Sequence, residues 1–195
     1  MPRRPRVESS SGLFHITSRA VRPARLFATR SDCTLFLYLL SEVERIAIHA
    51  YCLLGTHFHL VARGDAAAVA ASMRTLKGRY GQEINRRRAR VGPLFDSRYA
   101  ALPIESDEHV SAAFVYIAMN PVEAGIADRP EQWLFGSHRA HAGIDPRPAW
   151  LAPIETLGVF PEHADYVGAV SAAMQRREED NRGSDPGVRP RSECG

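Results

Sequence analysis

Two histidines one residue apart, His57 and His59, are the first residues whose types and spacing could do chemistry. They follow a Gly55-Thr56 turn signal and open a run of strand-forming residues. In a strand, residues i and i+2 point to the same face, so both imidazoles project together while Phe58 points to the other face. Two neighbouring imidazoles are costly to bury without a ligand. The pair is therefore either part of a metal site or, alternatively, a surface pair on a half-exposed strand.

A reactive group and a third ligand lie further along the chain, at Tyr116 and Asn120. Residues four apart are neighbours on one helix face. If this helix packs near the hairpin, the Asn120 side-chain oxygen completes a metal site with His57 and His59, and the Tyr116 phenol lies one turn away. A free phenol has a pKa of about 10, so a tyrosine nucleophile needs such help. The alternative is that Tyr116 is a half-buried core residue and Asn120 a helix-end residue.

The elements that must position these side chains follow from periodicity and turn signals. Strands are predicted at 14–18, 46–54, 57–62 and 94–104, and helices at 30–43, 66–90 and 106–120. The two middle strands form a β-hairpin, and Pro121 stops or kinks the last helix. The order β-α-β-β-α-β followed by a helix predicts an α+β sandwich, with helices on one face of an antiparallel sheet. His15 and His49 are interpreted as core or sheet histidines.

Length and composition bound the class of protein. The 195 residues, 45% of them hydrophobic, suit one domain with tails and exclude collagen-like and wholly disordered chains. No apolar run approaches the roughly 18 residues of a membrane span, which predicts a soluble protein without membrane contact. Three unevenly spaced cysteines indicate a reducing compartment, and we expect a cytoplasmic protein. The expected organisation is a basic arm at 1–11, a domain at 12–140, an extension with a short helix at 141–177 and a disordered tail at 178–195.

Positive charge is concentrated in two segments. Residues 1–30 hold seven arginines against one glutamate, and residues 74–98 hold eight basic residues against two acids. Localised positive charge is what binds a polyphosphate partner, so the clusters favour nucleic acid over a mere solvated helix face. The predicted DNA-backbone contacts are Arg74, Lys77, Arg79, Arg86, Arg87, Arg88, Arg90 and Arg98.

Four motifs occur in a fixed order along residues 12–140. They are His57-Phe-His59, Tyr80-Gly-Gln-Glu-Ile-Asn85, Gly92-Pro-Leu-Phe-Asp-Ser-Arg98-Tyr99 and Tyr116-Ile-Ala-Met-Asn120-Pro-Val122. Together they resemble the REP-associated tyrosine transposases, a branch of the single-tyrosine HUH transposases. Gly55-Thr56 departs from that pattern, because the family usually has Pro-Asn before the first histidine.

The resemblance implies a ferredoxin-like fold with the histidines on a central strand. It implies strand-specific cleavage and rejoining of single-stranded or hairpin DNA, in DNA transposition or REP-element processing, through a 5′-phosphotyrosine intermediate. Tyr116 is then the nucleophile, His57 and His59 are the metal-binding pair, Asn120 is the third ligand, and the metal is Mg²⁺ or Mn²⁺. The family includes monomers and dimers, so a homodimer stays open.

Three other functions remain open at this point. The first is a non-catalytic DNA-binding protein that retains the fold and does not need the Tyr116 hydroxyl. The second is a rolling-circle initiator or relaxase, disfavoured because 195 residues leave no room for a helicase domain. The third is a metal-dependent hydrolase of a small substrate, disfavoured because no acidic ligand accompanies the histidine pair.

Overall fold

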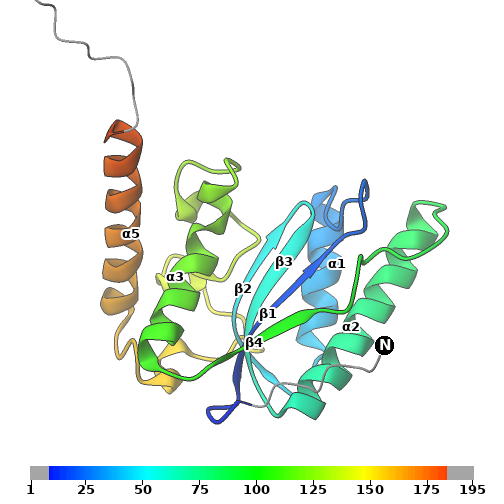
Figure 1. Cartoon of the computed structure of the whole chain (residues 1–195), viewed down its shortest axis with the longest axis horizontal. Coiled ribbons are helices and arrows are strands. Elements are labelled where there is room, and N and C mark those ends of the chain that lie inside the picture. Colours follow the sequence, from blue (N-terminus) through cyan, green and yellow to red (C-terminus); the bar gives the residue numbers. More distant parts are fainter. Residues whose placement is uncertain (1–8, 184–195) are drawn as a thin grey trace, which may run out of the picture.

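Four antiparallel strands form one sheet, which the computed structural model places between two layers of helices (Figure 1). The model describes residues 9–183. The strands are β1 (Leu13–Arg19), β2 (Ala47–Leu54), β3 (His57–Arg63) and β4 (Ala100–Ile104), in the order β2-β3-β1-β4. This is the predicted ferredoxin-like arrangement, and it makes β3 an inner strand between β2 and β1.

Helices cover both faces of the sheet, whereas the sequence predicted helices on one face. α1 (Arg30–Ser41) and α2 (Ala66–Arg87) pack on one face, and α3 (Asp107–Glu123) packs on the other, with α5 (His163–Gly183) beside it (Figure 1). Three short helical segments connect α3 to α5: η1 (Pro130–Gln132), α4 (His138–His141) and η2 (Ile154–Leu157). The physical reason is that the sheet is apolar on both faces, so each face needs a cover.

The strand pleat separates the two cores. Phe14 and Phe58 point toward α1 and α2 and pack with Phe36 of α1, whose ring centroid lies 4.8 Å from that of Phe58. Leu13 and Val61 point to the opposite face, toward Phe114 of α3. Since side chains alternate along a strand, the residues that flank Phe58 face α3.

The predicted β2–β3 hairpin is present, and its turn is Gly55-Thr56. Leu54 pairs with His57 and Cys52 with His59 across the hairpin. The predicted strand at 94–104 starts only at Ala100. Before it, Phe95 makes an isolated antiparallel bridge to Ala20, closed by hydrogen bonds from Val21 N–H to the Leu94 carbonyl and from Asp96 N–H to the Arg19 carbonyl.

α3 continues past Pro121 and ends at Glu123, three residues beyond the predicted end. Ser106 caps its N-terminus by accepting from the backbone N–H of His109. Pro121 removes only the N–H that would bond to Ile117, and the bond from Ala124 N–H to the Asn120 carbonyl, 2.9 Å, closes the last turn. The helix therefore does not stop at Pro121, because a single missing hydrogen bond near the helix end is tolerated.

The C-terminal helix is longer than expected. α5 extends to Gly183, so residues 178–183 are helical rather than part of a disordered tail. The rest of that tail, 184–195, and residues 1–8 of the predicted basic arm lie outside the described residues. Among the described residues, no helix is long and apolar enough to cross a membrane.

The outer edge of β2 is covered by residues 133–137. Leu53 N–H donates to the Phe135 carbonyl (2.9 Å), Trp133 Nε1 donates to the Leu53 carbonyl (3.1 Å), and Tyr51 N–H donates to Ser137 Oγ (3.0 Å). Covering an edge strand satisfies its backbone groups. The segment also connects β2 to the elements that follow α3, and so helps to hold α3 over the sheet.

Candidate active site

The strand register brings three histidines to the sheet face that α3 covers. Thr17 pairs directly with His59 and Arg19 with His57, so these β1 residues share a face with the histidine pair. His15 is two residues from Thr17 and lies on the same face. The ring centroids of His57 and His59 are 5.1 Å apart, and those of His15 and His59 are 5.2 Å apart. His57 and His59 therefore project together, as predicted, and His15 joins them.

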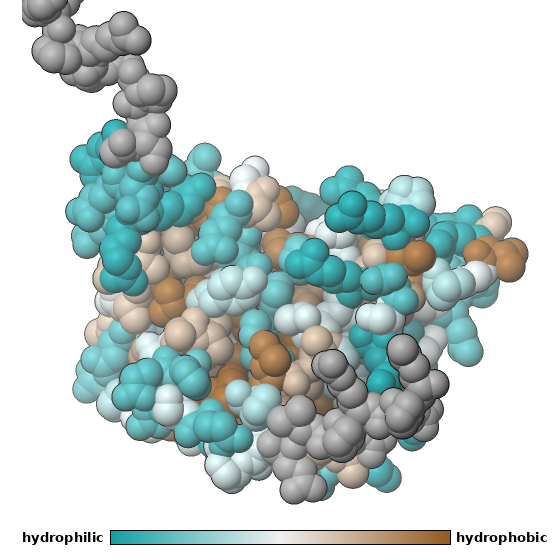
Figure 2. Space-filling view, in the orientation of Figure 1, coloured by the Kyte–Doolittle hydropathy of each residue, from teal (hydrophilic) through white to brown (hydrophobic). Residues whose placement is uncertain are grey.

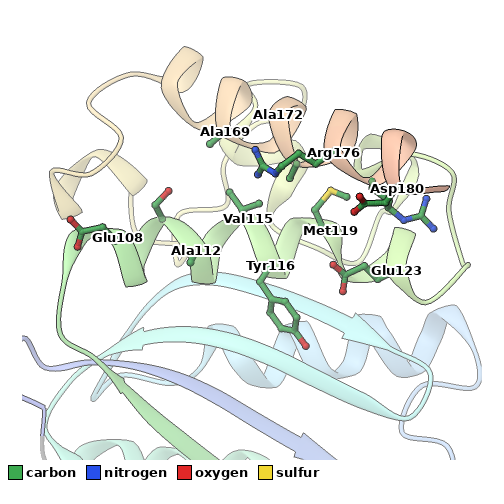
Figure 3. A pocket seen from close by; sticks show the side chains of 13 residues that line it. Glu108, Ala112, Val115, Tyr116, Met119, Glu123, Ala169, Ala172, Arg176 and Asp180 are labelled. Atoms are coloured by element: carbon green, nitrogen blue, oxygen red, sulfur yellow. The ribbon is translucent and has the colours of Figure 1, made fainter. Parts of the chain in front are cut away.

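α3 places Tyr116 over this cluster. Its ring centroid lies 5.3 Å from that of His59 and 5.7 Å from that of His15, both in edge-on contacts. Figure 3 shows the Tyr116 side chain pointing from α3 toward the sheet, away from α5. The residue is 41% exposed, because it lies at the edge of the buried stripe formed by Phe114, Ile117 and their neighbours. Tyr116 is thus half accessible at the site and not a core tyrosine.

The two strand histidines are held as neutral imidazoles. Burial, followed by the charges of His15, His57 and Arg19, lowers the pKa of His59 to about 3. Burial and then the Arg19 charge also lower the pKa of His57. A neutral imidazole has a free lone pair, which is the form that binds a metal.

Each of these histidines has one nitrogen already engaged. His57 Nδ1 lies 3.1 Å from Thr56 Oγ1, and His59 Nδ1 lies 3.0 Å from His15 Nε2. His59 Nε2 is buried and has no hydrogen-bond partner among the described residues. A buried polar atom without a partner needs an explanation, and an absent ligand is one.

Asn120 is buried one helical turn after Tyr116. Its side-chain Nδ2 donates to the Tyr116 carbonyl at 2.7 Å, so Oδ1 is the atom left to act as a ligand. Among the described residues, no three His, Cys, Asp or Glu side chains are grouped to hold a metal. By their chemistry, two neutral imidazoles and an amide oxygen would suit a weakly held divalent cation.

Arg19 is a site residue that the sequence analysis did not single out. It is exposed at the end of β1, directly opposite His57, and its charge lowers the pKa of both strand histidines. No hydrogen bond or ion pair is found for its guanidinium among the described residues. A cation beside two neutral imidazoles suits an anionic group such as a phosphate.

Two hollows meet at Tyr116. One lies between α3 and α5, where Tyr116, Glu123 and Arg176 contribute to its lining (Figure 3). The other lies between β4 and α3 and is lined by His15, Leu102, His109 and Tyr116. Figure 2 shows hydrophobic side chains on the face that carries α3 and β4, where Leu102 is 62% exposed. The site is therefore open to a large substrate rather than closed around a small one.

Five of the eight predicted DNA-contact residues make side-chain contacts with other parts of the chain. Arg88 donates to the buried carboxylate of Asp32 (2.7 Å), and Lys77 Nζ donates to the Ser97 carbonyl (2.8 Å). Arg90 donates to the Pro93 carbonyl (3.2 Å), while Arg86 and Arg87 both pair with Glu83. Two carboxylates, Glu83 and Asp32, thus compensate part of the positive charge at the end of α2. The sequence did not reveal this, because the partners of Arg88 and Lys77 are distant along the chain.

Three members of the predicted set, Arg74, Arg79 and Arg98, are exposed, and no ion pair or hydrogen bond of their guanidinium groups is found among the described residues. Arg74 and Arg79 belong to α2, which packs on the opposite face of the sheet from Tyr116. Contact of these residues with DNA stays a prediction. Any DNA that reaches both α2 and Tyr116 must pass around the edge or end of the sheet.

Comparison with known proteins identifies the fold. A solved structure of a REP-associated tyrosine transposase bound to a REP hairpin superposes with a TM-score of 0.62, over 78% of this chain and 92% of that one, at 19% sequence identity. No protein-family model and no curated protein matches the sequence. The chain therefore has a REP-associated tyrosine transposase-like fold, as its motifs indicated.

Other histidines serve the packing of α4 and α5. His138 Nδ1 lies 2.9 Å from the Tyr166 hydroxyl, and His141 Nε2 lies 2.8 Å from the His49 carbonyl. All three histidines are buried. His15 is a sheet histidine in β1, as the sequence indicates, and it also lies beside His59 and Tyr116. The period-two pattern of β1 shows which residues share a strand face with His15, but only the pairing of β1 with β3 shows that this is the face that carries His57 and His59.

Proposed function

We propose that this chain cleaves and rejoins single-stranded DNA through a covalent link between Tyr116 and a DNA phosphate. The observation that carries the proposal is the half-exposed Tyr116 phenol packed edge-on against His59, whose buried Nε2 has no partner among the described residues. The solved structure with the same fold is a transposase bound to a REP hairpin, which supports hairpin DNA as the substrate class.

The proposed reaction exchanges one phosphodiester for another. The Tyr116 oxygen attacks the scissile phosphorus, a tyrosine–phosphate bond forms, and the bond from phosphorus to the 3′-oxygen breaks. The proton lost by the phenol is balanced by the one gained at the released 3′-hydroxyl. The 5′ end of the downstream strand stays on Tyr116, so attack by a 3′-hydroxyl can reverse the step without ATP.

His57, His59 and Asn120 would hold a divalent cation, Mg²⁺ or Mn²⁺, through the nitrogens and amide oxygen described above. When bound, that cation neutralises charge on the phosphate and orients it. Arg19, exposed opposite His57, binds the scissile or a neighbouring phosphate through charge-assisted hydrogen bonds. α3 holds Tyr116 on a rigid element, which limits the positional freedom of the nucleophile.

Covalent capture tests the proposal. Single-stranded hairpin DNA from the flanks of the protein's own gene is labelled at either its 3′ or its 5′ end. It is incubated with protein and Mn²⁺ or EDTA and separated on a denaturing gel. We expect a Mn²⁺-dependent shifted band that carries the 3′ label and not the 5′ label. Tyr116→Phe, which removes only the hydroxyl, and His57→Ala should abolish it.

Tyr38→Phe is the matched control, because Tyr38 is an exposed tyrosine on α1, on the other face of the sheet. It should leave the band unchanged. If no band forms but native gels show tight hairpin binding that survives Tyr116→Phe, the chain is a non-catalytic DNA-binding protein that keeps the fold. If the band carries the 5′ label, the polarity of the proposed link is wrong.

A further inference from the structure

His15 stands closest to the proposed metal-binding pair without being one of its members. Its Nε2 lies 3.0 Å from Nδ1 of His59, a normal hydrogen-bond distance, and the two rings are tilted by 32°. The contact follows from β1 and β3 lying side by side, since His15 is diagonal to His59 in the antiparallel register. Because β1 and β3 are the paired inner strands of the sheet, the contact between the two rings is held in place by the strand register.

A hydrogen bond between two neutral imidazoles has two forms. In one, His15 Nε2–H donates to His59 Nδ1, and His59 then carries its own proton on Nε2. In the other, His59 Nδ1–H donates to His15 Nε2, and His59 Nε2 keeps a free lone pair. Only the second form leaves His59 able to bind a cation through the nitrogen that has no other partner.

We propose that His15 is a positioning residue that accepts the Nδ1 proton of His59 and thereby holds His59 in its metal-binding tautomer. The inference rests on the proposed function, because His59 is a ligand of the proposed metal site and His15 would be the hydrogen-bond partner of its other ring nitrogen. Histidine ligands in metal sites ordinarily donate their other ring N–H to an acceptor, which fixes the tautomer and the ring orientation. A carboxylate or carbonyl often fills that role, and here a third imidazole from the neighbouring strand fills it.

His15 acts through His59 rather than as a ligand itself. Its Nε2, the nitrogen on the side of the site, is occupied by the contact with His59 Nδ1. The described residues also show no grouping of three histidine, cysteine or acidic side chains suited to a metal, although His15, His57 and His59 are neighbours. His15 also contacts Tyr116 edge-on, so the same ring supports both the nucleophile and the histidine beside it.

The test measures the tautomer and the metal affinity separately from catalysis. Long-range ¹H–¹⁵N correlation spectra of metal-free, DNA-free protein report which nitrogen of His59 carries the proton. Mn²⁺ titration followed by electron paramagnetic resonance gives the dissociation constant. The variants are His15→Phe, which keeps a ring and removes the acceptor, and His15→Gln, whose side-chain oxygen can accept from His59 Nδ1.

We expect the wild-type protein and His15→Gln to show His59 protonated at Nδ1 and to bind Mn²⁺ with similar affinity. His15→Phe should lose the Nδ1–H tautomer and bind Mn²⁺ about 10- to 100-fold more weakly, the usual cost of removing such a partner. His109→Phe is the matched control, since His109 lines the same hollow from α3. It should change neither readout. Thermal unfolding verifies that each variant is folded.

The possible failures are distinct. If His15→Phe keeps both the tautomer and the affinity, or if wild-type His59 carries its proton on Nε2, His15 has no positioning role, while covalent capture by Tyr116 remains possible. If wild-type protein binds no Mn²⁺, the metal of the proposed function is wrong and this inference falls with it. If covalent capture fails while both readouts respond to His15→Phe, the proposed reaction is wrong and the positioning role stands.

Discussion

Replacing Arg88 by alanine should destabilise the fold without weakening DNA binding, although Arg88 belongs to the most basic run of the sequence. Its guanidinium donates to Asp32 Oδ2 at 2.7 Å and to the carbonyls of Arg25 (2.6 Å) and Leu26 (3.2 Å). It thereby connects the end of α2 to the start of α1. The Asp32 side chain is only 6% exposed, so the charge it carries is buried.

The magnitude follows from what Asp32 keeps after the change. Removing one partner of a buried ion pair costs about 3–5 kcal/mol. Asp32 would still accept from the backbone N–H groups of Ala28 (3.0 Å) and Thr29 (2.9 Å), which lowers the cost. Two carbonyls would lose a donor, at about 1 kcal/mol each or less. We expect a loss of about 3 kcal/mol in the free energy of unfolding.

The pKa of Asp32 is consistent with this role. Burial opposes ionisation, but hydrogen bonds from Thr29 and Arg88 overcome it and hold the Asp32 pKa below its ordinary value. The carboxylate is therefore charged at neutral pH and depends on Arg88 for its compensation. The stability that it contributes is present above the unfolded-state pKa and is lost as the pH falls through the folded-state pKa.

Urea unfolding at pH 7 measures the effect. With a slope of about 2–3 kcal/mol per molar, the midpoint should fall by about 1–1.5 M for Arg88→Ala. Arg87→Ala is the matched control, because Arg87 pairs with Glu83 on the surface, where such a pair contributes about 0.5 kcal/mol or less.

DNA binding is read from fluorescence anisotropy over a range of salt concentrations. Losing one phosphate contact to a single strand lowers the slope of log affinity against log salt by about 0.7. Arg88→Ala should leave the slope unchanged, and Arg79→Ala, on the exposed side of α2, should lower it. Unchanged stability together with a lowered slope for Arg88→Ala would refute the reasoning and return Arg88 to the DNA interface.

Two further predictions concern the buried histidines and the proposed phosphate site. Burial, followed by smaller electrostatic effects, lowers the pKa of His141 to about 4. The unfolded chain thus takes up a proton below about pH 6.5 that the folded chain takes up only near pH 4. His141 alone should therefore lower stability by up to about 3 kcal/mol between those values. Urea unfolding at pH 7.5 and 4.5 measures the loss, and His141→Gln should reduce it by that amount, while the other buried histidines keep part of the dependence. For Arg19→Gln we expect covalent capture about 10- to 100-fold slower, from the loss of a charge-assisted hydrogen bond, with Mn²⁺ affinity not reduced. Equal capture rates would remove Arg19 from the proposed site.

Much of the fold is local in origin and was predictable from the sequence. The Thr29–Asp32 capping box, the Gly55-Thr56 hairpin turn and the Ser106 cap depend on residues within a few positions of one another. The same is true of the statement that His57 and His59 share a strand face, because the pleat has a period of two. The order of these elements, with the four motifs, also indicated the transposase-like fold.

The composition of the site was decided by tertiary structure. His15 and Arg19 join the pair on β3 only because β1 lies beside β3 in one register, and a shift by one residue would turn both to the other face. The position of Tyr116 over His59 depends on α3 covering the face opposite α1 and α2. Charge compensation is likewise non-local, since Arg88 meets Asp32 from 56 residues away. Sequence alone determines which side chains share a local face, because neighbours in the chain obey fixed periods. Which faces then meet depends on packing between distant segments, and the site is made at that contact.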